Sequence, residues 1–261
     1  MRKHLTSSIL LLALSLLFLF SCGNKKEAQT EKNEPLETEA KKPKAEKKPR
    51  PHPYEKEMKK WASYDGLLSS CEGSKLNLAI PVNIIAANIS KDSLQYNVEP
   101  FSDCSGVFLR FLDSLEIRCP KMDYPDPASY RDSRALARWY HETGKLIRVE
   151  EPLNMAQYIK PGSVMFYGGR GVENKELSLD DLFAHGGINH VGVVTEVEEK
   201  GGEIVGYSLF HGQRPGKLAS TTKYHKREYR NRPNYPAYGN GTEQWVAVAP
   251  IVDTDGKVFG K

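Results

Sequence analysis

Two short segments carry residues that could act together as a nucleophile and its base. In residues 103–106 (Asp-Cys-Ser-Gly), Cys104 stands where an apolar-periodic run begins, so we expect it at a helix N-terminus. Such a terminus carries partial positive charge, which lowers a thiol pKa and favours the nucleophilic thiolate. In residues 189–192 (Asn-His-Val-Gly), His190 begins an apolar strand. A histidine held on a strand can serve as general base to a helix-borne cysteine.

With two further segments, these strings resemble the NlpC family of papain-like, cell-wall cysteine peptidases. Residues 161–167 (Pro-Gly-Ser-Val-Met-Phe-Tyr) resemble the family's Pro-Gly-Asp and apolar strand. Residues 210–212 (Phe-His-Gly) resemble the segment with its third polar residue. The four segments occur in the family's order, and the resemblance covers roughly residues 75–250. It implies an α+β, papain-like fold, with the nucleophile helix packed on an antiparallel sheet that carries the histidine.

The resemblance implies a catalytic triad of Cys104, His190 and His211. His190 would take the thiol proton, and His211 would fix the tautomer and ring plane of His190 through a hydrogen bond. Two alternatives remain open on the residues themselves. His185, five residues earlier, could be the base, and Gln213 could replace His211 as the orienting residue.

The resemblance also implies which residues contact the substrate. Asp103 and Ser105 flank the nucleophile, at positions that in the family often contact the amino end of the stem peptide. Tyr96 stands where the family places a tyrosine before Asp-Cys. The family's Gly-Gly pair is missing from residues 96–101, its Pro-Gly-Asp reads Pro-Gly-Ser at 161–163, and the spacing between triad residues is longer. The missing glycines predict a different substrate-side loop, and the longer spacing predicts extra loops at residues 168–174 and 186–187.

The implied function is hydrolysis of peptidoglycan stem peptides by a cysteine endopeptidase, at the bond between γ-D-glutamate and a diamino acid. An N-acetylmuramoyl-L-alanine amidase of the same cysteine–histidine group is one alternative. A catalytically inactive wall-binding lipoprotein is another. We expect no metal and no cofactor, because the sequence has no Cys-x-x-Cys or His-Glu-x-x-His pair and no phosphate-binding glycine loop. We also expect the protein to be a monomer.

The N-terminus resembles a bacterial lipoprotein signal. Residues 1–21 combine a positive flank with an apolar run too short for a comfortable membrane span, and Cys22 follows as the residue to be lipidated. Residues 22–53 are rich in Lys, Glu and Pro and should form a disordered tether. Residues 54–261 should form the peptidase domain. We therefore expect a lipid anchor at the bacterial cell envelope, with the outer membrane favoured.

Charge and cysteine content narrow the function classes further. The formal net charge is +4, and it falls by two when Arg2 and Lys3 leave with the signal. This balance argues against a dedicated nucleic-acid-binding protein. Cys71 and Cys119 have no assigned role. They could pair in an oxidising compartment, but we expect two buried free thiols.

Hydrophobic periodicity predicts helices first and strands later, as in an α+β domain. The expected helices cover residues 55–70, 76–89, 104–115 and 130–143, with a short one starting near residue 178. The expected strands cover residues 164–167, 190–197, 204–211 and 245–249. Residues 212–242 are expected as a loop, either over one end of the cleft or elsewhere on the surface.

Overall fold

A computed structural model of the chain describes residues 78–251, except 118, 121, 170, 227–234, 240 and 242. All described residues belong to one of two compact units, residues 50–261. The expected signal peptide, Cys22, the tether, Cys71 and the helix expected over 55–70 lie outside the described residues. Within the described part, no helix combines the length and the apolar character needed to cross a membrane.

The described elements are four α-helices, three short 3₁₀ helices and six strands. The α-helices are α2 (Ala79–Lys91), α3 (Cys104–Glu116), α4 (Ser133–Glu142) and α5 (Leu179–Phe183). The 3₁₀ helices are η1 (Pro152–Asn154), η2 (Ala156–Tyr158) and η3 (Asn174–Glu176). The strands are β1 (Ile147–Arg148), β2 (Ser163–Gly168), β3 (Ile188–Lys200), β4 (Glu203–His211), β5 (Ser220–His225) and β6 (Gln244–Pro250).

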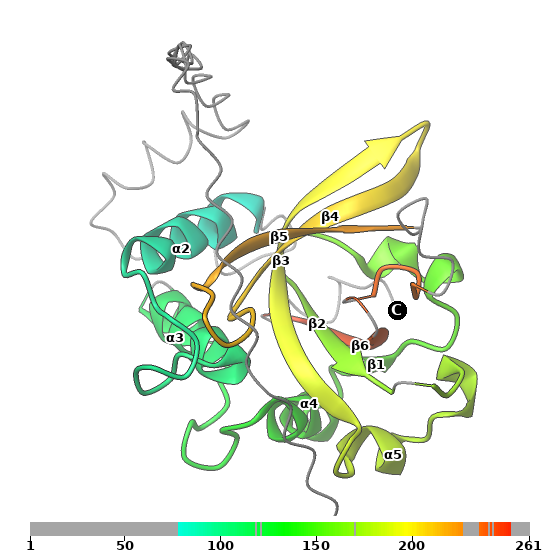
Figure 1. Cartoon of the computed structure of the whole chain (residues 1–261), viewed down its shortest axis with the longest axis horizontal. Helices are drawn as coiled ribbons and strands as arrows, with labels where there is room; N and C mark the ends of the chain where they lie inside the picture. The colour runs from blue at the N-terminus through cyan, green and yellow to red at the C-terminus, as the bar shows by residue number, and fades with distance from the viewer. Residues whose placement is uncertain are drawn as a thin grey trace, which may run out of the picture. The chain divides into compact units, whose positions relative to one another are not determined.

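The strands form one antiparallel sheet in the order β1-β6-β2-β3-β4-β5. Figure 1 shows α2 and α3 side by side next to the sheet, and the long β3–β4 hairpin that projects beyond it. The expected α+β class is confirmed: helices from the N-terminal part pack on a six-stranded antiparallel sheet.

Two apolar clusters cover the two faces of this sheet. The larger lies between the sheet and the helices and includes Phe111 of α3, Leu136 of α4 and Val191 of β3. The smaller is rich in aromatic rings and includes Tyr167 and Tyr207. Because successive residues of a strand point to opposite faces, neighbours along β3 and β4 contribute to different clusters.

Helix α3 follows from its sequence as expected. Its apolar residues recur at three- and four-residue intervals and are almost fully buried: Val107, Phe108, Phe111, Leu112 and Leu115. Asp103 is the N-cap, and its carboxylate accepts a hydrogen bond from the N–H of Gly106 at 2.7 Å. The cap and the apolar face together fix where the helix starts, and hence where Cys104 lies.

The expectation of a loop over residues 212–242 is wrong in part. Ser220–His225 forms β5, which pairs with β4 at the edge of the sheet. Its outward-facing residues are polar, as an edge strand permits, so hydrophobic periodicity gave no signal for it. The two-residue strand β1 was also missed, because two residues are too few to show a period.

The expectation of a free thiol at Cys119 is also wrong. Cys119 is buried and disulfide-bonded. Cys71 lies outside the described residues. Among the described cysteines, only Cys104 has a free thiol.

Candidate active site

Close backbone packing holds the start of α3 against two loops. A Cβ atom at Gly106 would lie 2.4 Å from Cα of Phe101, so this position needs glycine for the preceding loop to pass. A Cβ atom at Gly212 would lie 2.8 Å from the carbonyl oxygen of Asp103 and 3.0 Å from the nitrogen of Cys104. The chain leaving β4 therefore packs directly on the residue that carries the candidate nucleophile.

The thiol of Cys104 contacts strand β3 on both sides of His190. Its Sγ lies 3.8 Å from the carbonyl oxygen of Asn189, and the N–H of Val191 is hydrogen-bonded to the sulfur. The backbone N–H groups of Cys104 and Ser105 are also hydrogen-bonded to the sulfur and lower its pKa, as expected at a helix N-terminus. Cys104 is 6 % exposed.

The Tyr96 side chain forms a further contact with the thiol. Its hydroxyl is hydrogen-bonded to Cys104. Burial is the main cause that raises the pKa of Tyr96 to about 12, followed by the charge that Cys104 would carry as a thiolate and then by the charge of Asp103. The residue that the sequence suggested for substrate binding is therefore placed directly against the candidate nucleophile.

The expected lowering of the Cys104 pKa is not observed. Burial, and then the negative charge of Asp103, raise this pKa to about 11. The three backbone N–H groups oppose the shift, but their effect is smaller. In the free protein at neutral pH, Cys104 is therefore a neutral thiol rather than a thiolate.

His190 and His211 form a hydrogen-bonded pair on the aromatic face of the sheet. Nε2 of His190 lies 2.7 Å from Nδ1 of His211, with the rings almost perpendicular at 86°. The ring of Tyr167 packs against His190, and the ring of Tyr224 against His211. The histidines are 5 % and 4 % exposed.

Burial keeps both imidazoles neutral. It lowers the pKa of His190 to about 4. The pKa of His211 is lowered well below its usual value by burial, and further by the charge that His190 would carry. Each ring therefore holds one proton at neutral pH, which leaves one ring nitrogen of each as a hydrogen-bond acceptor.

The thiol and the histidine pair are adjacent, but they are not hydrogen-bonded in this structure. The thiol's side-chain hydrogen bonds go to Asn189 and Tyr96, and those of the His190 ring to His211. Because Nε2 of His190 is engaged by His211, Nδ1 is the nitrogen left for the thiol. Hydrogen bonds of catalytic pairs are often long or misaligned in free enzymes and tighten with substrate.

The structure places the two alternative residues away from this pair. Gln213 donates a hydrogen bond to the hydroxyl of Ser220 at 2.5 Å, so its amide is directed to β5. His185 is exposed in the loop before β3. Of the candidates, His211 is the residue that contacts His190.

Asp103 and Ser105 form a polar cluster with Arg131, a residue that sequence reasoning missed. A guanidinium nitrogen of Arg131 lies 3.0 Å from the Asp103 carboxylate, and another donates to the Ser105 hydroxyl at 2.9 Å. The guanidinium also covers the ring of Phe101 at 4.6 Å. Arg131 lies outside the recognised segments and nothing local marked it.

The loop before Cys104 holds two non-glycine residues in a backbone conformation that favours glycine. Asn97 and Phe101 both have φ of +58°, in the left-handed region that favours glycine. Arg110 Nε donates to the Phe101 carbonyl at 3.0 Å and helps to hold this conformation. Strained non-glycine residues that persist next to a candidate nucleophile are a frequent feature of functional sites.

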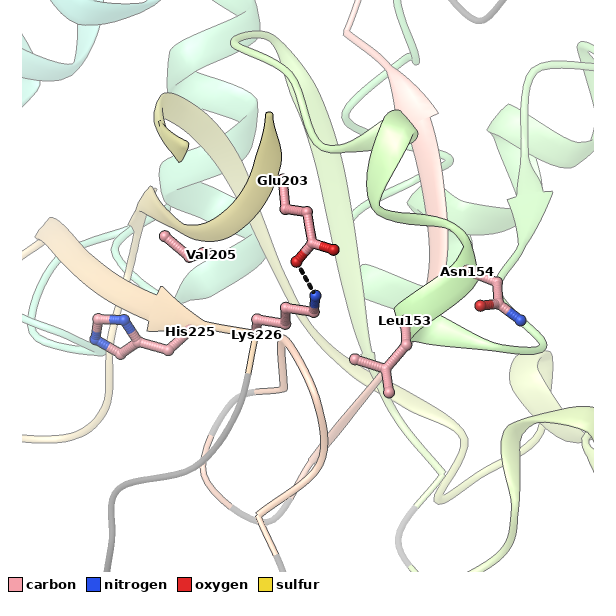
Figure 2. Close-up of a pocket in the computed structure, with 6 residues that line it drawn as sticks. All are labelled: Leu153, Asn154, Glu203, Val205, His225 and Lys226. Carbon is pink, nitrogen blue, oxygen red and sulfur yellow. Dashed lines mark hydrogen bonds and ion pairs between the residues drawn. The ribbon is translucent and has the colours of Figure 1, made fainter. Parts of the chain in front are cut away.

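A pocket elsewhere on the molecule is separate from this cluster. Figure 2 shows its lining residues: Leu153, Asn154, Glu203, Val205, His225 and Lys226. An ion pair of 2.7 Å joins Lys226 Nζ to the Glu203 carboxylate in it. The lining residue His225 pairs with Gly206, five residues before His211 on β4, so roughly 17 Å of strand separates the pocket from the histidine pair.

Within the described residues, no three His, Cys, Asp or Glu side chains come together as they would to hold a metal ion. Comparison of the chain with models of protein families, with curated proteins and with solved structures found no match. The resemblance to the NlpC family therefore rests on the sequence segments alone and stays a prediction.

Proposed function

We propose that this protein is a papain-like, NlpC-type cysteine peptidase that cleaves peptidoglycan stem peptides. One observation carries the proposal. The thiol of Cys104, at the N-terminus of α3, contacts the backbone on both sides of His190, and the imidazole of His190 is hydrogen-bonded to His211. A free thiol beside an oriented imidazole is the arrangement that acyl transfer by cysteine requires.

The reaction begins with proton transfer inside a neutral pair. Nδ1 of His190 accepts the thiol proton as the sulfur attacks the carbonyl carbon of the scissile amide. The C–N bond then breaks, and the imidazolium of His190 gives its proton to the leaving amine. Water, activated by the same nitrogen, attacks the thioester and releases the acid and the free thiol. Since the resting thiol is protonated, substrate binding must bring the thiol and Nδ1 into hydrogen-bond contact.

The first turn of α3 provides donors for the oxyanion. The N–H of Gly106 is bonded to the Asp103 side chain, and that of Val107 to the Asp103 carbonyl. The N–H groups of Cys104 and Ser105 face the sulfur instead. In the proposed mechanism they stabilise the charge that develops on the carbonyl oxygen next to the sulfur, where one such donor is typically worth 10²–10³ in rate.

The cluster around Asp103 forms the substrate-binding side of the site. Asp103 and Ser105 contact the amino end of the stem peptide, as the resemblance implies, and Tyr96 contacts the segment next to the thiol. The enzyme is a monomer without a cofactor, held at the bacterial cell envelope by lipid on Cys22, with the outer membrane favoured. The bond cleaved is the one between γ-D-glutamate and the diamino acid.

The test is digestion of purified muropeptides by the full-length protein and by Cys104→Ala, with the products identified by mass spectrometry. We expect cleavage by the parent only, with fragments that end at γ-D-glutamate. Ser114→Ala, on the same helix but away from its N-terminus, is the matched control and should cleave like the parent.

Other outcomes would change the proposal in defined ways. Release of intact stem peptide from muramic acid would identify an amidase of the same cysteine–histidine group. Binding to muropeptides without cleavage by the folded parent would contradict the enzymatic proposal and identify a wall-binding protein. The raised pKa of Cys104 favours this second outcome, because it disfavours the nucleophilic thiolate.

A further inference from the structure

We propose that Thr222 is a positioning residue of this site, which fixes the tautomers of His211 and His190 so that His190 offers a basic Nδ1. Its hydroxyl oxygen lies 3.0 Å from Nε2 of His211. With the bond between the histidines, this forms a chain of three side chains, from β3 through β4 to β5. The positioning role rests on the proposed function, but the direction of these hydrogen bonds does not.

The register of the sheet places Thr222 on the aromatic face beside His211. Thr222 pairs with Leu209, whose side chain belongs to the aromatic cluster, and His211 is two residues further along β4. Residues two apart on a strand share a face, and diagonal neighbours on adjacent strands are in contact range. The hydroxyl of Thr222 is thus brought to His211 by backbone pairing rather than by a flexible loop.

Only one direction of the hydrogen bonds leaves His190 able to act as a base. If Nε2–H of His190 donates to Nδ1 of His211, then Nε2–H of His211 donates to the Thr222 oxygen, and Nδ1 of His190 carries a lone pair. If the Thr222 hydroxyl donates instead, the order reverses and the proton of His190 resides on Nδ1. Thr222 is partly buried, so in the first arrangement its own hydrogen can point to solvent.

The surroundings of the pair allow both rings to stay neutral, as this chain of bonds requires. The ring of His211 faces His190 and Tyr224, and the ring of His190 also faces Tyr167. Burial raises the pKa values of both tyrosines, so neither is charged near neutral pH. The carboxylate of Glu243 is close enough for its charge to raise the pKa values of Tyr167 and Tyr224. Among the described residues neither imidazole is hydrogen-bonded to a carboxylate, and the Thr222 oxygen is the group at the end of the chain.

Replacing Thr222 by valine removes the hydroxyl but keeps the shape of the side chain. Thr222→Val leaves Nε2–H of His211 without an acceptor, and a buried N–H without a partner is costlier than a lone pair without one. We expect both rings to switch tautomer and kcat on muropeptides to fall about tenfold, with little change in KM. Thr222→Ser restores the oxygen and should recover most of the rate. Thr221→Val, on the exposed face of the same strand, is the control.

The deciding measurement is the tautomer of each histidine in the full-length protein, from two-bond and three-bond ¹H–¹⁵N correlations of the imidazoles at pH 7. We expect Nε2–H on both His190 and His211 in the parent, Thr222→Ser and Thr221→Val, and Nδ1–H on both in Thr222→Val. Nδ1–H on His211 in the parent, or an unchanged spectrum in Thr222→Val, would overturn the proposal.

This measurement needs no substrate, so it separates the two proposals. If the parent cleaves no muropeptide, the proposed function fails while the tautomer result still decides the hydrogen-bond chain. If the parent cleaves and Thr222→Val switches the tautomers without lowering kcat, the positioning role is overturned and the proposed function stands.

Discussion

Nε2 of His190 and Nδ1 of His211 are 2.7 Å apart, on neighbouring strands and on the face of the sheet away from α3. The thiol of Cys104 reaches the same strand from the helix side, at the backbone of Asn189 and Val191. The site is therefore built at the point where β4 ends and leaves one edge of β3 open. Gly212, which follows β4, packs closely on the start of the helix at this opening.

The pH dependence of cleavage should reflect the lowered pKa of the buried His190. Burial lowers its pKa to about 4, and the base must be neutral to accept a proton. We expect the acid limb of kcat/KM near pH 4, well below the value of about 6.5 for free imidazole. The measurement is kcat/KM on a muropeptide from pH 3.5 to 9, with the fold checked by circular dichroism at each pH. An acid limb near pH 6.5 in folded protein would show that His190 is solvated or is not the base.

Stability should depend on pH for the same reason. In the unfolded chain His190 binds a proton near pH 6.5, whereas in the folded protein it does so only near pH 4. Its contribution to the free energy of unfolding is complete above pH 6.5 and is lost as pH falls toward 4. Measured by urea unfolding at pH 7 and at pH 4.5, the free energy of unfolding should fall by about 2 kcal/mol less in His190→Gln than in the parent. His185→Gln, at an exposed histidine, should lose as much as the parent.

Removal of the negative charge at Asp103 should make the thiol more reactive. Asp103 is the second cause, after burial, of the raised Cys104 pKa. Asp103→Asn can still cap the helix, since asparagine is as good an N-cap as aspartate. We expect a lower thiol pKa, seen as faster alkylation by iodoacetamide at pH 8 to 9. A rate that is unchanged or slower, with the parent's thermal stability, would contradict the assigned role of this charge.

Removal of the Tyr96 hydroxyl should have the opposite effect on the thiol. This hydroxyl is hydrogen-bonded to the sulfur, and a donor stabilises the thiolate. In Tyr96→Phe we expect a higher thiol pKa and alkylation slowed by about tenfold or more at pH 9, since a hydrogen bond to a charged group contributes about 1.5–3 kcal/mol. Tyr124→Phe loses a hydroxyl bonded to the Cys119 carbonyl, near the other end of α3, and should react like the parent.

The sequence was sufficient for the parts of the site that depend on local patterns. The start of α3 at Cys104 follows from its cap and apolar face, and the strand at His190 from its β-branched run. A hydrogen bond between His211 and His190 was expected from the resemblance, but the strand pairing and register that bring the two side chains together were not predicted. The two irregularities of this pairing, near Thr195 and Glu199, offset each other, so Val193↔Phe210 keeps the register of Lys200↔Glu203 at the hairpin end.

The remaining features come from tertiary packing and could not be predicted locally. The rise in the Cys104 pKa arises because burial outweighs the helix N-terminus, and burial depends on the whole fold. Arg131 and Thr222 come from a loop and an edge strand with ordinary polar sequences. The disulfide at Cys119 needed three-dimensional proximity that sequence spacing does not give.

The central claim is that Cys104 and His190 act as one catalytic unit. The most direct test compares kcat of muropeptide cleavage for the parent, Cys104→Ala, His190→Ala and the double variant. Residues that act as a unit are strongly non-additive, so each single change should lower kcat by about 10³ or more and the double variant should be no worse. Cleavage by His190→Ala at the parent's rate, or losses that multiply in the double variant, would contradict the account.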